Sequence, residues 1–518
     1  MLKNTTQPTQ ERALEQKLAT ILSDPAFGWI TMLASSFPKA EVYLVGGALR
    51  DAAMGRTDQK DYDFVVRHIA AHALEKFLEA HGHVDFVGKT FGVFKFYPKD
   101  STNPEAIDIA LPRTDHAYGT GGYKAVEVKT RETLPIEQDL ERRDFTMNAM
   151  AWDVKSRHLL DPFHGLKDIE AKVLCAVGNP RVRFQEDYSR MLRALRFACQ
   201  LDCTIDTATW TALQELMTHV DDIVNQERVV PYEIIARELL KSFVTNPTLA
   251  FDLYETSGAF AVLLPEILAM KNCPHQSEFH SEGDVWMHTR LALKKLDDPM
   301  FKTEFPDARN RALVVMGTLL HDIGKPQTVK VLTEGPHHGT LAYHGHDKIG
   351  AATAATICRR LKLSSLSKEG GLHVGCDDLH WIVANHLLIL NAKIDEMRAS
   401  TIERYFFNDR VPGQDLLAVI LADSLATIPK DCAQDLGRFH EMRKRIEEIR
   451  AIQGERRGRY RDLPAPLLSG EDIMGAFNFE PGNKIGKLLR VAREQQLQGK
   501  LKNKADAIAF LRQILQTS

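Results

Sequence analysis

Long apolar segments are missing from this chain of 518 residues. No window reaches the roughly 18 consecutive apolar residues that a membrane-spanning helix needs, so we expect no transmembrane span. The N-terminal stretch MLKNTTQPTQERALEQK is polar and lacks the apolar core of a secretory signal. These absences argue against an integral membrane protein and a secreted protein, and they favour a cytoplasmic location.

Cysteine is also sparse, and the net charge is small. The seven cysteines include no CxxC pair, which argues against a disulfide framework or a cysteine-based zinc site. Cys199 and Cys203 lie four residues apart on a predicted helix, where core thiols are favoured over a metal or redox role. The formal net charge of -3 indicates no particular partner, so local clusters must decide. The remaining composition is that of an ordinary globular protein.

The length predicts about three to four domains. Short β-rich runs alternate with helical segments up to about residue 185, and amphipathic helices follow to the end of the chain. We therefore expect an α+β protein with an α/β head and helical regions after it. The predicted divisions are a lead-in at 1–27, a head at 28–185, a helical neck at 186–285, an all-α domain at 286–430 and a basic helical tail at 431–518.

The sharpest motif is LVGGALRDAAMGRTDQKDYDFVV. Gly46 and Gly47 close an apolar strand, and such a pair lets backbone N–H groups approach phosphates. Asp61 and Asp63 are two residues apart on the next predicted strand, so their side chains share a face. Adjacent carboxylates repel each other unless a cation lies between them, and their oxygens suit Mg²⁺ shared with substrate phosphates. With Asp108 in AIDIAL as a third carboxylate, the pattern predicts metal-assisted phosphoryl transfer.

Three further segments accompany this motif in order: ERRDFTMNAMAWD (141–153), DPFHGLKDI (161–169) and EDYSR (186–190). Together the four resemble the class II tRNA nucleotidyltransferases, that is, the CCA-adding enzymes and the related bacterial poly(A) polymerases of the polymerase-β-type superfamily. The resemblance covers roughly residues 40–200. It implies a polymerase-β-type nucleotidyltransferase head and nucleotide addition to RNA.

The resemblance also implies site residues. The implied catalytic residues are Asp61, Asp63 and Asp108, with Mg²⁺ held by the first two. The implied nucleotide-binding residues are Gly46, Gly47, Arg50, Arg143, Asp144, Asn148, Glu186, Asp187, Arg190 and Arg193.

The chemistry of EDYSR supports the same interpretation. Its spacing predicts that Glu186, Asp187 and Arg190 fall within one helical turn, with the last two on one face. A carboxylate offers acceptors and a guanidinium offers a fork of donors, so such a pair can read the Watson–Crick edge of a base. The resemblance implies that this protein template admits C or A. From the spacing alone, a surface ion pair is the alternative.

Residues 112–139 are rich in glycine, threonine and charge. They resemble the flexible loop between the family motifs, and a mobile element here would allow the pocket to switch from C to A. An ordinary surface connection is the alternative.

A second ordered set lies further along, in HTRLAL, LLHDIGKP, YHGHDKIGA and LADS. It supplies an H…HD…D arrangement from His288, His321, Asp322 and Asp423. Imidazoles and carboxylates together suit a transition metal such as Ni²⁺, Mn²⁺, Co²⁺ or Fe²⁺. Such a metal lowers the pKa of bound water and thereby supports phosphoester hydrolysis.

This set resembles the HD phosphohydrolase superfamily, which some bacterial CCA-adding enzymes carry fused after the transferase. The resemblance implies phosphatase, 2′-nucleotidase and 2′,3′-cyclic phosphodiesterase activities. His346 and His386 are further candidate ligands, whereas His275 and His280 are assigned no role. A degenerate HD fold retained as a scaffold is the alternative.

Two stretches near the end are basic. Residues 438–461 contain nine Lys or Arg against four Glu, and residues 484–504 contain seven against one. The second has helical spacing, which suits contacts to RNA phosphates, although a solvated helix face explains it equally well in isolation.

We therefore expect an enzyme that adds C, C and A to tRNA from CTP and ATP, with an HD site that repairs 3′ ends. A poly(A) polymerase or an A-adding enzyme is the alternative within the class. A primarily hydrolytic HD phosphodiesterase is an alternative of another class, and a non-enzymatic tRNA-binding protein is a third. The sequence does not determine the oligomeric state.

Overall fold

The chain folds into two compact units in the computed structural model. The first comprises residues 1–242 and 252–263, and the second comprises 243–251 and 264–518. The structure describes residues 7–517 with the exception of 57–60, 88–92, 100–104, 118–120, 123–125, 277, 279, 309–310, 335–337, 368–370, 409, 431–434 and 452–464. The finer division into five parts stays a prediction.

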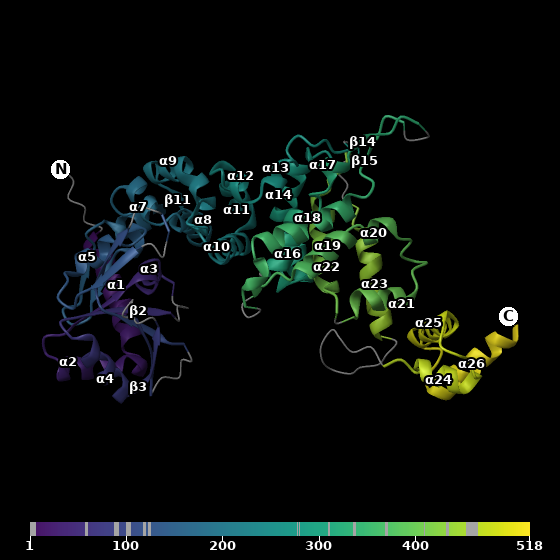
Figure 1. Ribbon diagram of the computed structural model, residues 1–518, viewed down its shortest axis with the longest axis horizontal. Coiled ribbons are helices and arrows are strands. Elements are labelled where there is room, and N and C mark those ends of the chain that lie inside the picture. The colour runs from purple at the N-terminus through teal and green to yellow at the C-terminus, as the bar shows by residue number, and fades with distance from the viewer. Residues whose placement is uncertain are drawn as a thin grey trace. The chain divides into compact units, whose positions relative to one another are not determined.

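The first unit combines a mixed sheet with helices (Figure 1). Its strands are β1 (Glu41–Val45), β2 (Tyr62–Arg67), β3 (Gly82–Val87), β4 (Val93–Pro98), β5 (Ile107–Ala110), β6 (Arg113–Ala117), β7 (Val126–Thr130), β8 (Ala151–Asp153), β9 (His158–Leu160), β10 (Val173–Leu174), β11 (Thr204–Ile205), β12 (Ile223–Val224) and β13 (Glu227–Arg228). Its helices are α1 (Gln7–Leu22), α2 (Gly28–Ser36), α3 (Gly46–Ala53), α4 (Ala71–His81), α5 (Ile136–Glu141), α6 (Gly165–Ala171), α7 (Pro180–Glu186), α8 (Ser189–Leu201), α9 (Thr207–Leu216) and α12 (Ala259–Leu263). Two more, α10 (Tyr232–Thr245) and α11 (Pro247–Thr256), have residues in both units.

Seven strands form the main sheet, in the order β3-β4-β5-β2-β1-β8-β9. Every neighbouring pair is antiparallel except β2 and β5, which run parallel. Their register sets Asp63 opposite Asp108. Because β1 also pairs with β2, Val45 lies opposite Asp63, and the glycine pair that follows Val45 begins α3 at the same edge of the sheet.

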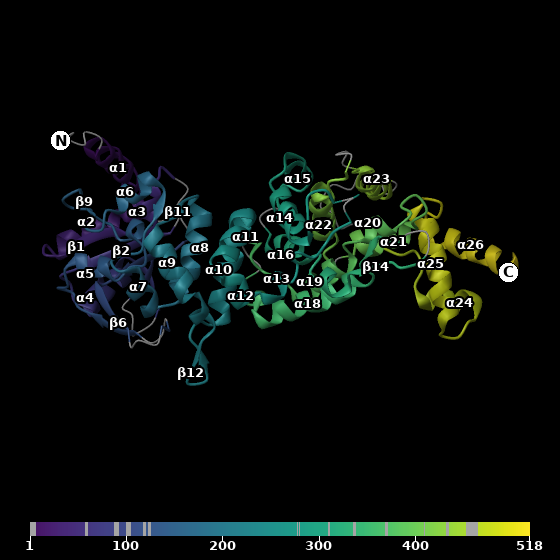
Figure 2. The ribbon, with the colours of Figure 1, turned by 90° about the horizontal axis from the view of Figure 1, so that it is seen from above.

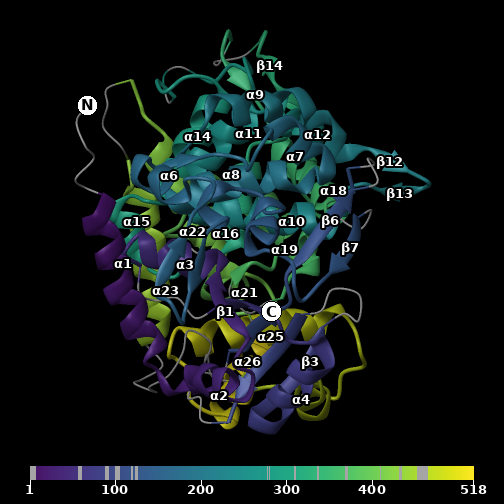
Figure 3. The ribbon, with the colours of Figure 1, turned by 90° about the vertical axis from the view of Figure 1, so that its left-hand side faces the viewer.

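The predicted lead-in is a helix. In α1, Leu14 and Leu18 are fully buried, and Figure 3 shows α1 beside α3. Burying a leucine side chain contributes roughly 1.5–3 kcal/mol, which is enough to attach a helix that is otherwise polar. After residue 185 the strands in the described part of the chain are two residues long, in agreement with the weak strand signals there. One pair, β12 and β13, stands out from its neighbours in Figures 2 and 3.

A buried ion pair joins α8 to α10. Arg196 donates from Nε to Glu238, and both residues are less than a tenth exposed. Burial raises the pKa of the Glu238 carboxyl, but the Arg196 guanidinium outweighs this and holds the pKa below its usual range.

We expect Glu238→Ala to destabilise the first unit by about 3–5 kcal/mol, because the Arg196 charge stays buried without its partner. A carboxylate with a depressed pKa stabilises the fold above its unfolded pKa, so the advantage of the wild type shrinks as the pH falls below about 4. Calorimetric unfolding at several pH values measures this, with exposed Glu170→Ala in α6 as the control. Equal transitions for the two variants would contradict the prediction.

The second unit is almost entirely helical (Figure 1). Its helices are α13 (Pro265–Leu268), α14 (Val285–Lys295), α15 (Pro299–Glu304), α16 (Ala312–Leu320), α17 (Lys325–Thr328), α18 (His346–Arg360), α19 (Cys376–Asn385), α20 (Leu388–Asn391), α21 (Ala399–Phe406), α22 (Gly413–Ala426), α23 (Gly437–Ala451), α24 (Gly470–Phe477), α25 (Asn483–Leu497) and α26 (Lys504–Thr517). One short ribbon pairs β14 (Lys330–Val331) with β15 (Leu341–Ala342).

Two apolar helices form the centre of this unit. All nine residues of α16 are buried, as are most of those of α22, which explains why both read as continuous apolar runs. α14 packs on both of them and α19 packs on α16, so the ends of these helices converge.

The predicted basic face on α25 is present. Lys484, Lys487 and Arg490 recur every three residues and are exposed, while Ile485 and Leu488 face the core. In the other predicted basic stretch, 438–461, the residues from 452 onward lie outside the described part of the chain.

Four cysteines of the described residues are free thiols, and Cys199 and Cys203 are buried as predicted. Burial raises the pKa of these two thiols to about 12 and about 11, which is typical of core cysteines. The sequence does not predict the disulfide that joins Cys358 on α18 to Cys376 on α19, because 18 residues separate them and only helix packing brings them together. Among the described helices, none has the length and apolarity to cross a bilayer.

Candidate active sites

Three carboxylates meet at one edge of the main sheet. Asp61, Asp63 and Asp108 line a cavity of about 410 Å³, together with Lys95. Asp61 directly precedes β2, and the β2–β5 register sets the other two side by side. Asp108, the predicted third carboxylate, thus lies on the strand next to Asp63, as the sequence predicts. The sequence does not indicate Lys95, whose Nζ lies 3.5 Å from Asp108 Oδ1.

The crowding of these carboxylates is costly. Burial raises the pKa of the Asp63 carboxyl, and the Asp108 and Asp61 carboxylates raise it further against the opposing charge of Arg143. Asp108 Oδ1 is buried and has no hydrogen-bond partner in the described part of the chain. A divalent cation relieves both conditions, so these residues fit a hard metal ion with oxygen ligands.

Gly46 makes the close approach at this edge possible. Its backbone is left-handed, with φ of 72°, and a Cβ there would lie 2.8 Å from Asp63 Oδ2. Gly47 follows as the second residue of α3, so the helix begins directly beside the carboxylates.

Gly46→Ala places an alanine in a left-handed backbone conformation, which costs about 1–2 kcal/mol, and the new Cβ displaces the Asp63 carboxylate. We expect nucleotide incorporation to fall by about 10- to 100-fold. Single-turnover incorporation measures the loss. Gly475→Ala in α24, where nothing lies within 4 Å, is the control and is expected to leave the rate unchanged. A normal rate in Gly46→Ala would show that this contact is not needed.

Four of the predicted nucleotide-binding residues form one network, in which Arg50 of α3 meets Asp144, Asn148 and Arg193 from beyond β7. Arg50 donates to Asp51 at 2.9 and 3.0 Å and to Asn148 Oδ1 at 2.8 Å. Asn148 donates to Asp144 at 3.2 Å, and Asp144 accepts from Arg193 Nε at 2.8 Å. Although burial raises the pKa of the Asp144 carboxyl, the Arg193 charge lowers it to about 2. Because Asp51 and Asn148 already bind the Arg50 guanidinium, the geometry favours a role for Arg50 in positioning these side chains. Direct binding of the nucleotide by Arg50 stays a prediction.

Arg143 lies beside this network. It donates to Asp139 Oδ2 at 3.1 Å and to the Asn148 backbone carbonyl at 3.5 Å. Arg142 donates to the same carboxylate from Nε at 3.0 Å. Asp139 is fully buried, and the two guanidinium groups hold its pKa below the usual range although burial raises it.

The predicted single turn across EDYSR is wrong. Helix α7 ends at Glu186, Asp187 is extended with φ of -157°, and α8 begins at Ser189. The break occurs because the Asp187 carboxylate accepts from the Ser189 N–H at 2.9 Å, as the side chain at a helix start does. The ion pair instead joins Glu186 to Arg190 at 2.6 Å, across the corner between α7 and α8.

Residues 112–139 are more regular than the predicted loop. β6 and β7 pair antiparallel, and α5 follows, while 118–120 and 123–125 lie outside the described residues. The Gly121 carbonyl accepts from the Tyr188 N–H at 2.9 Å. A Cβ on Gly121 would lie 2.0 Å from the Tyr188 ring, so only glycine permits this contact. The segment is thereby attached to the residue after Asp187, and its motion stays a prediction.

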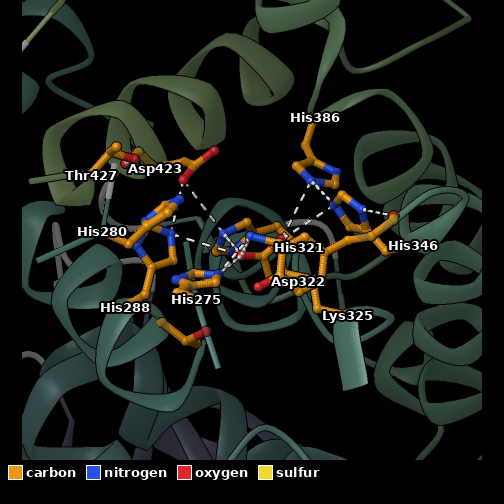
Figure 4. Close-up of polar contacts among 12 residues, drawn as sticks. His275, His280, His288, His321, Asp322, Lys325, His346, His386, Asp423 and Thr427 are labelled. Atoms are coloured by element: carbon orange, nitrogen blue, oxygen red, sulfur yellow. Dashed lines mark hydrogen bonds and ion pairs between the residues drawn. The ribbon is translucent and has the colours of Figure 1, made fainter. Parts of the chain in front are cut away.

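The second site is built from residues of α14, α18 and α22 and from residues that directly follow α16 and α19. Figure 4 shows the labelled side chains gathered around Asp322. Its donor atoms form two groups, and within each group they lie within 4.8 Å of one another. The groups are His288, His321 and Asp423, and Asp322, His346 and His386. All six predicted ligands, including the two less certain histidines, are therefore brought together.

Backbone carbonyls orient three of the histidines. The Nδ1 atoms of His321, His346 and His386 lie 2.7–2.8 Å from carbonyl oxygens three residues earlier in the chain. Each Nδ1 therefore carries the proton, and each Nε2 presents its lone pair to the cluster. This shared orientation is the one that metal-ligating histidines need.

Asp322 joins the two groups. Its Oδ1 lies 3.5 Å from His346 Nε2 and 3.7 Å from His386 Nε2. Its Oδ2 lies 3.2 Å from His321 Nε2 and 2.7 Å from Lys325 Nζ. Burial raises the pKa of the Asp322 carboxyl, but the facing His321 and Lys325 lower it well below its ordinary value.

The residues fit a bound transition metal. His321 Nε2 is buried and forms no well-oriented hydrogen bond among the described residues, and it faces Asp322 Oδ2 at 3.2 Å and Asp423 Oδ1 at 3.7 Å. Burial opposes a positive charge on His288, yet its bonds to Asp423 and Glu282 raise its pKa to about 9. Surroundings that favour a proton on an imidazole favour a metal cation in its place.

The structure adds residues that the sequence did not indicate. His275, His280 and Glu282 lie against His288, and the His280 and His288 Nδ1 atoms are 2.7 and 2.8 Å from Glu282 Oε1. Lys325 Nζ lies 2.8 Å from His275 Nε2. The close spacing of histidines and Glu282 before α14 is the available signal, but isolated histidines are more often structural, so the pattern alone does not single them out.

Two family models match the chain. One describes the poly A polymerase head domain and matches residues 42–175, which contain the carboxylate cavity. The other describes the HD domain and matches residues 284–428, which contain the histidine cluster.

A multifunctional CCA protein of Nitrosococcus oceani is 35% identical over 325 residues, which cover 62% of this chain and 70% of the relative. The chain belongs to the tRNA nucleotidyltransferase family. This tRNA nucleotidyltransferase is also 31% identical to an A-adding tRNA nucleotidyltransferase of Deinococcus radiodurans over 378 residues, which cover 73% of this chain and 78% of that relative.

Solved structures confirm the fold of the nucleotidyltransferase. The Bacillus stearothermophilus CCA-adding enzyme in complex with CTP has a TM-score of 0.58 at 18% identity and covers 95% of this chain and 98% of that one. The Thermotoga maritima CCA-adding enzyme complexed with tRNA has a TM-score of 0.59 at 17% identity, with 97% and 98% covered. The α+β fold class and the HD domain of the sequence prediction are therefore confirmed.

Proposed function

We propose that the chain adds C, C and A to the 3′ end of tRNA, using CTP and ATP. The observation that carries this proposal is the placement of Asp61, Asp63 and Asp108 on one cavity in a member of the tRNA nucleotidyltransferase family. The relatives named multifunctional CCA proteins support it.

Asp61 and Asp63 would hold Mg²⁺, with Asp108 completing the anionic wall. When bound, the ion stabilises the negative charge that develops on the transferring phosphoryl group. Gly46 and Gly47 leave space at the start of α3 for the triphosphate, whose charge the N-terminus of the helix favours.

Asp187 and Arg190 select the base in this proposal. The carboxylate accepts from the amino group that cytosine and adenine share, and the guanidinium donates to the adjacent ring acceptors. Glu186 keeps Arg190 in place through their 2.6 Å ion pair. Guanine and uracil present a carbonyl where the carboxylate needs a donor, so they are rejected.

The test uses three tRNA transcripts that end at the discriminator, at C and at CC, each with CTP, ATP or both. Product length is read at single-nucleotide resolution. Growth by two with CTP, and by one A only after CC, is expected. Addition of A alone would place the chain with the A-adding enzymes, and a long A ladder on any RNA would indicate a poly(A) polymerase. Either result would overturn the proposal of CCA addition.

We further propose that the HD cluster is a metal-dependent phosphohydrolase acting on 2′,3′-cyclic or 2′-phosphate ends. His288, His321, Asp322, Asp423, His346 and His386 would hold Ni²⁺, Mn²⁺, Co²⁺ or Fe²⁺. The metal supplies an activated water, while Lys325 places a positive charge beside the cluster. The converging Nε2 atoms support this proposal over a degenerate scaffold, which would not need them.

The exposed face of α25 with Lys484, Lys487 and Arg490 is proposed to contact tRNA phosphates. Such contacts predict that incorporation on tRNA weakens with rising salt more steeply in the wild type than in a variant with all three changed to Gln. We infer a cytoplasmic location from this substrate.

A further inference from the structure

His288 is oriented differently from the other histidines of the HD cluster. It belongs to α14, and its Nε2 is 2.9 Å from Asp423 Oδ1, on the cluster side. Its Nδ1, on the opposite side of the ring, is 2.8 Å from Glu282 Oε1. A carboxylate thus stands where the other three histidines have a backbone carbonyl.

Glu282 is held firmly in this position. Its side chain is 4% exposed, and its Oε2 accepts from the Ile428 N–H at 3.1 Å. The same loop is attached to the chain that follows α22, because the Ser281 N–H donates to the Ile428 carbonyl at 2.8 Å and the Lys430 N–H to the Glu278 carbonyl at 3.0 Å. α22 carries Asp423, so one set of bonds positions both the carboxylate behind His288 and the ligand in front of it.

We propose that Glu282 is a positioning residue that keeps the His288 Nδ1 protonated and its Nε2 directed at the HD metal. A carboxylate behind a ligating imidazole fixes the tautomer and makes the imidazole a stronger donor. His280, whose Nδ1 is 2.7 Å from the same Glu282 oxygen, supports the carboxylate from the other side. This inference rests on the proposed metal binding by the HD cluster.

The neighbouring group of His275, His280, Glu282 and His288 suggests a separate metal site as the competing explanation. Two contacts oppose it. The Nδ1 atoms of His280 and His288 both donate hydrogen bonds to Glu282. His275 Nε2 accepts from the Lys325 ammonium, so the ring proton of His275 lies on Nδ1. Imidazole N–H groups do not bind metals, so these residues support His288 and do not form a metal site of their own.

The experiment measures Co²⁺ binding to the full-length wild type, to Glu282→Gln and to Glu278→Gln, by titration calorimetry and visible absorption. Glu278 lies in the same loop and is exposed, so it is the matched control. We expect Glu282→Gln to bind Co²⁺ roughly 10- to 100-fold more weakly at unchanged stoichiometry, with an altered absorption spectrum. Glu278→Gln is expected to match the wild type.

Three outcomes would decide against the proposal. Wild-type affinity in Glu282→Gln would show that the carboxylate is dispensable, and loss of one equivalent with the remaining affinity intact would indicate a separate metal site. The third outcome is a lower melting temperature of metal-free Glu282→Gln that accounts for the lost affinity, which would indicate general damage to the fold. In that case Glu282→Asp, which keeps the negative charge on a shorter side chain, would also fail to restore Co²⁺ binding. If the wild type itself binds no Co²⁺, the proposed HD metal site fails instead, independently of Glu282.

Discussion

Asp63→Asn is expected to abolish nucleotide incorporation while hydrolysis at the HD cluster continues. The amide has nearly the shape of the carboxylate, so the strand register with Asp108 is retained. The change removes one negative charge from a cavity in which burial and the Asp108 and Asp61 carboxylates raise the pKa of Asp63. Losing about 4 kcal/mol of metal-assisted stabilisation of the transition state lowers the rate by about 10³-fold.

The measurement is single-turnover addition to a transcript ending at the discriminator, at saturating Mg²⁺ and CTP. Asp85→Asn is the control, because Asp85 is an exposed aspartate on β3 of the same sheet. Incorporation by Asp63→Asn within about fivefold of the wild type would rule out the cavity as the transferase site. Simultaneous loss of both activities would indicate that the substitution damages the fold.

Asp322→Asn has the opposite expected result: incorporation persists, and hydrolysis of a 2′,3′-cyclic phosphate end is lost. Asp322 faces His321 on one oxygen and His346 and His386 on the other, so its loss leaves the second ligand group incomplete and removes the carboxylate that joins it to the first. The change also leaves the buried Lys325 ammonium without the carboxylate 2.7 Å away. We expect metal affinity to fall by more than about 100-fold and hydrolysis to fall with it.

Bound metal is measured after gel filtration, together with opening of the cyclic phosphate to a terminal phosphomonoester. The control is Asp377→Asn at the start of α19, because that side chain is fully exposed. His386→Asn serves as a second variant in case the buried Lys325 charge prevents Asp322→Asn from folding. Hydrolysis that survives in both variants would contradict a catalytic role for the cluster.

The motifs that depend on local geometry could be predicted from the sequence. Asp61 and Asp63 lie at strand spacing, and β2 and β5 follow directly from DYDFVV and AIDIAL. His321 and Asp322 directly follow the apolar run of α16, as LLHDIG indicates. In each case one short segment contains both the pattern that predicts the secondary structure and the residues that predict the chemistry. The prediction therefore does not depend on contacts between distant segments.

What could not be predicted depends on contacts between distant segments. The helix break at Asp187 results from a side chain that bonds forward to Ser189, and helical periodicity does not report such a competition. Glu282 gains its place only through backbone bonds to Ile428, and Gly121 only through its contact with Tyr188. Cys358 and Cys376 likewise meet through the packing of α18 on α19.

The way the chain passes between its two units has a practical consequence for truncated variants. Residues 243–251 belong to the second unit although the residues on both sides, up to 242 and from 252 to 263, belong to the first. No single cut therefore separates the two units: a cut after residue 242 removes 252–263 from the first unit, and a cut after residue 263 leaves 243–251 attached to it. Point substitutions such as Asp63→Asn and Asp322→Asn separate the two sites without this difficulty.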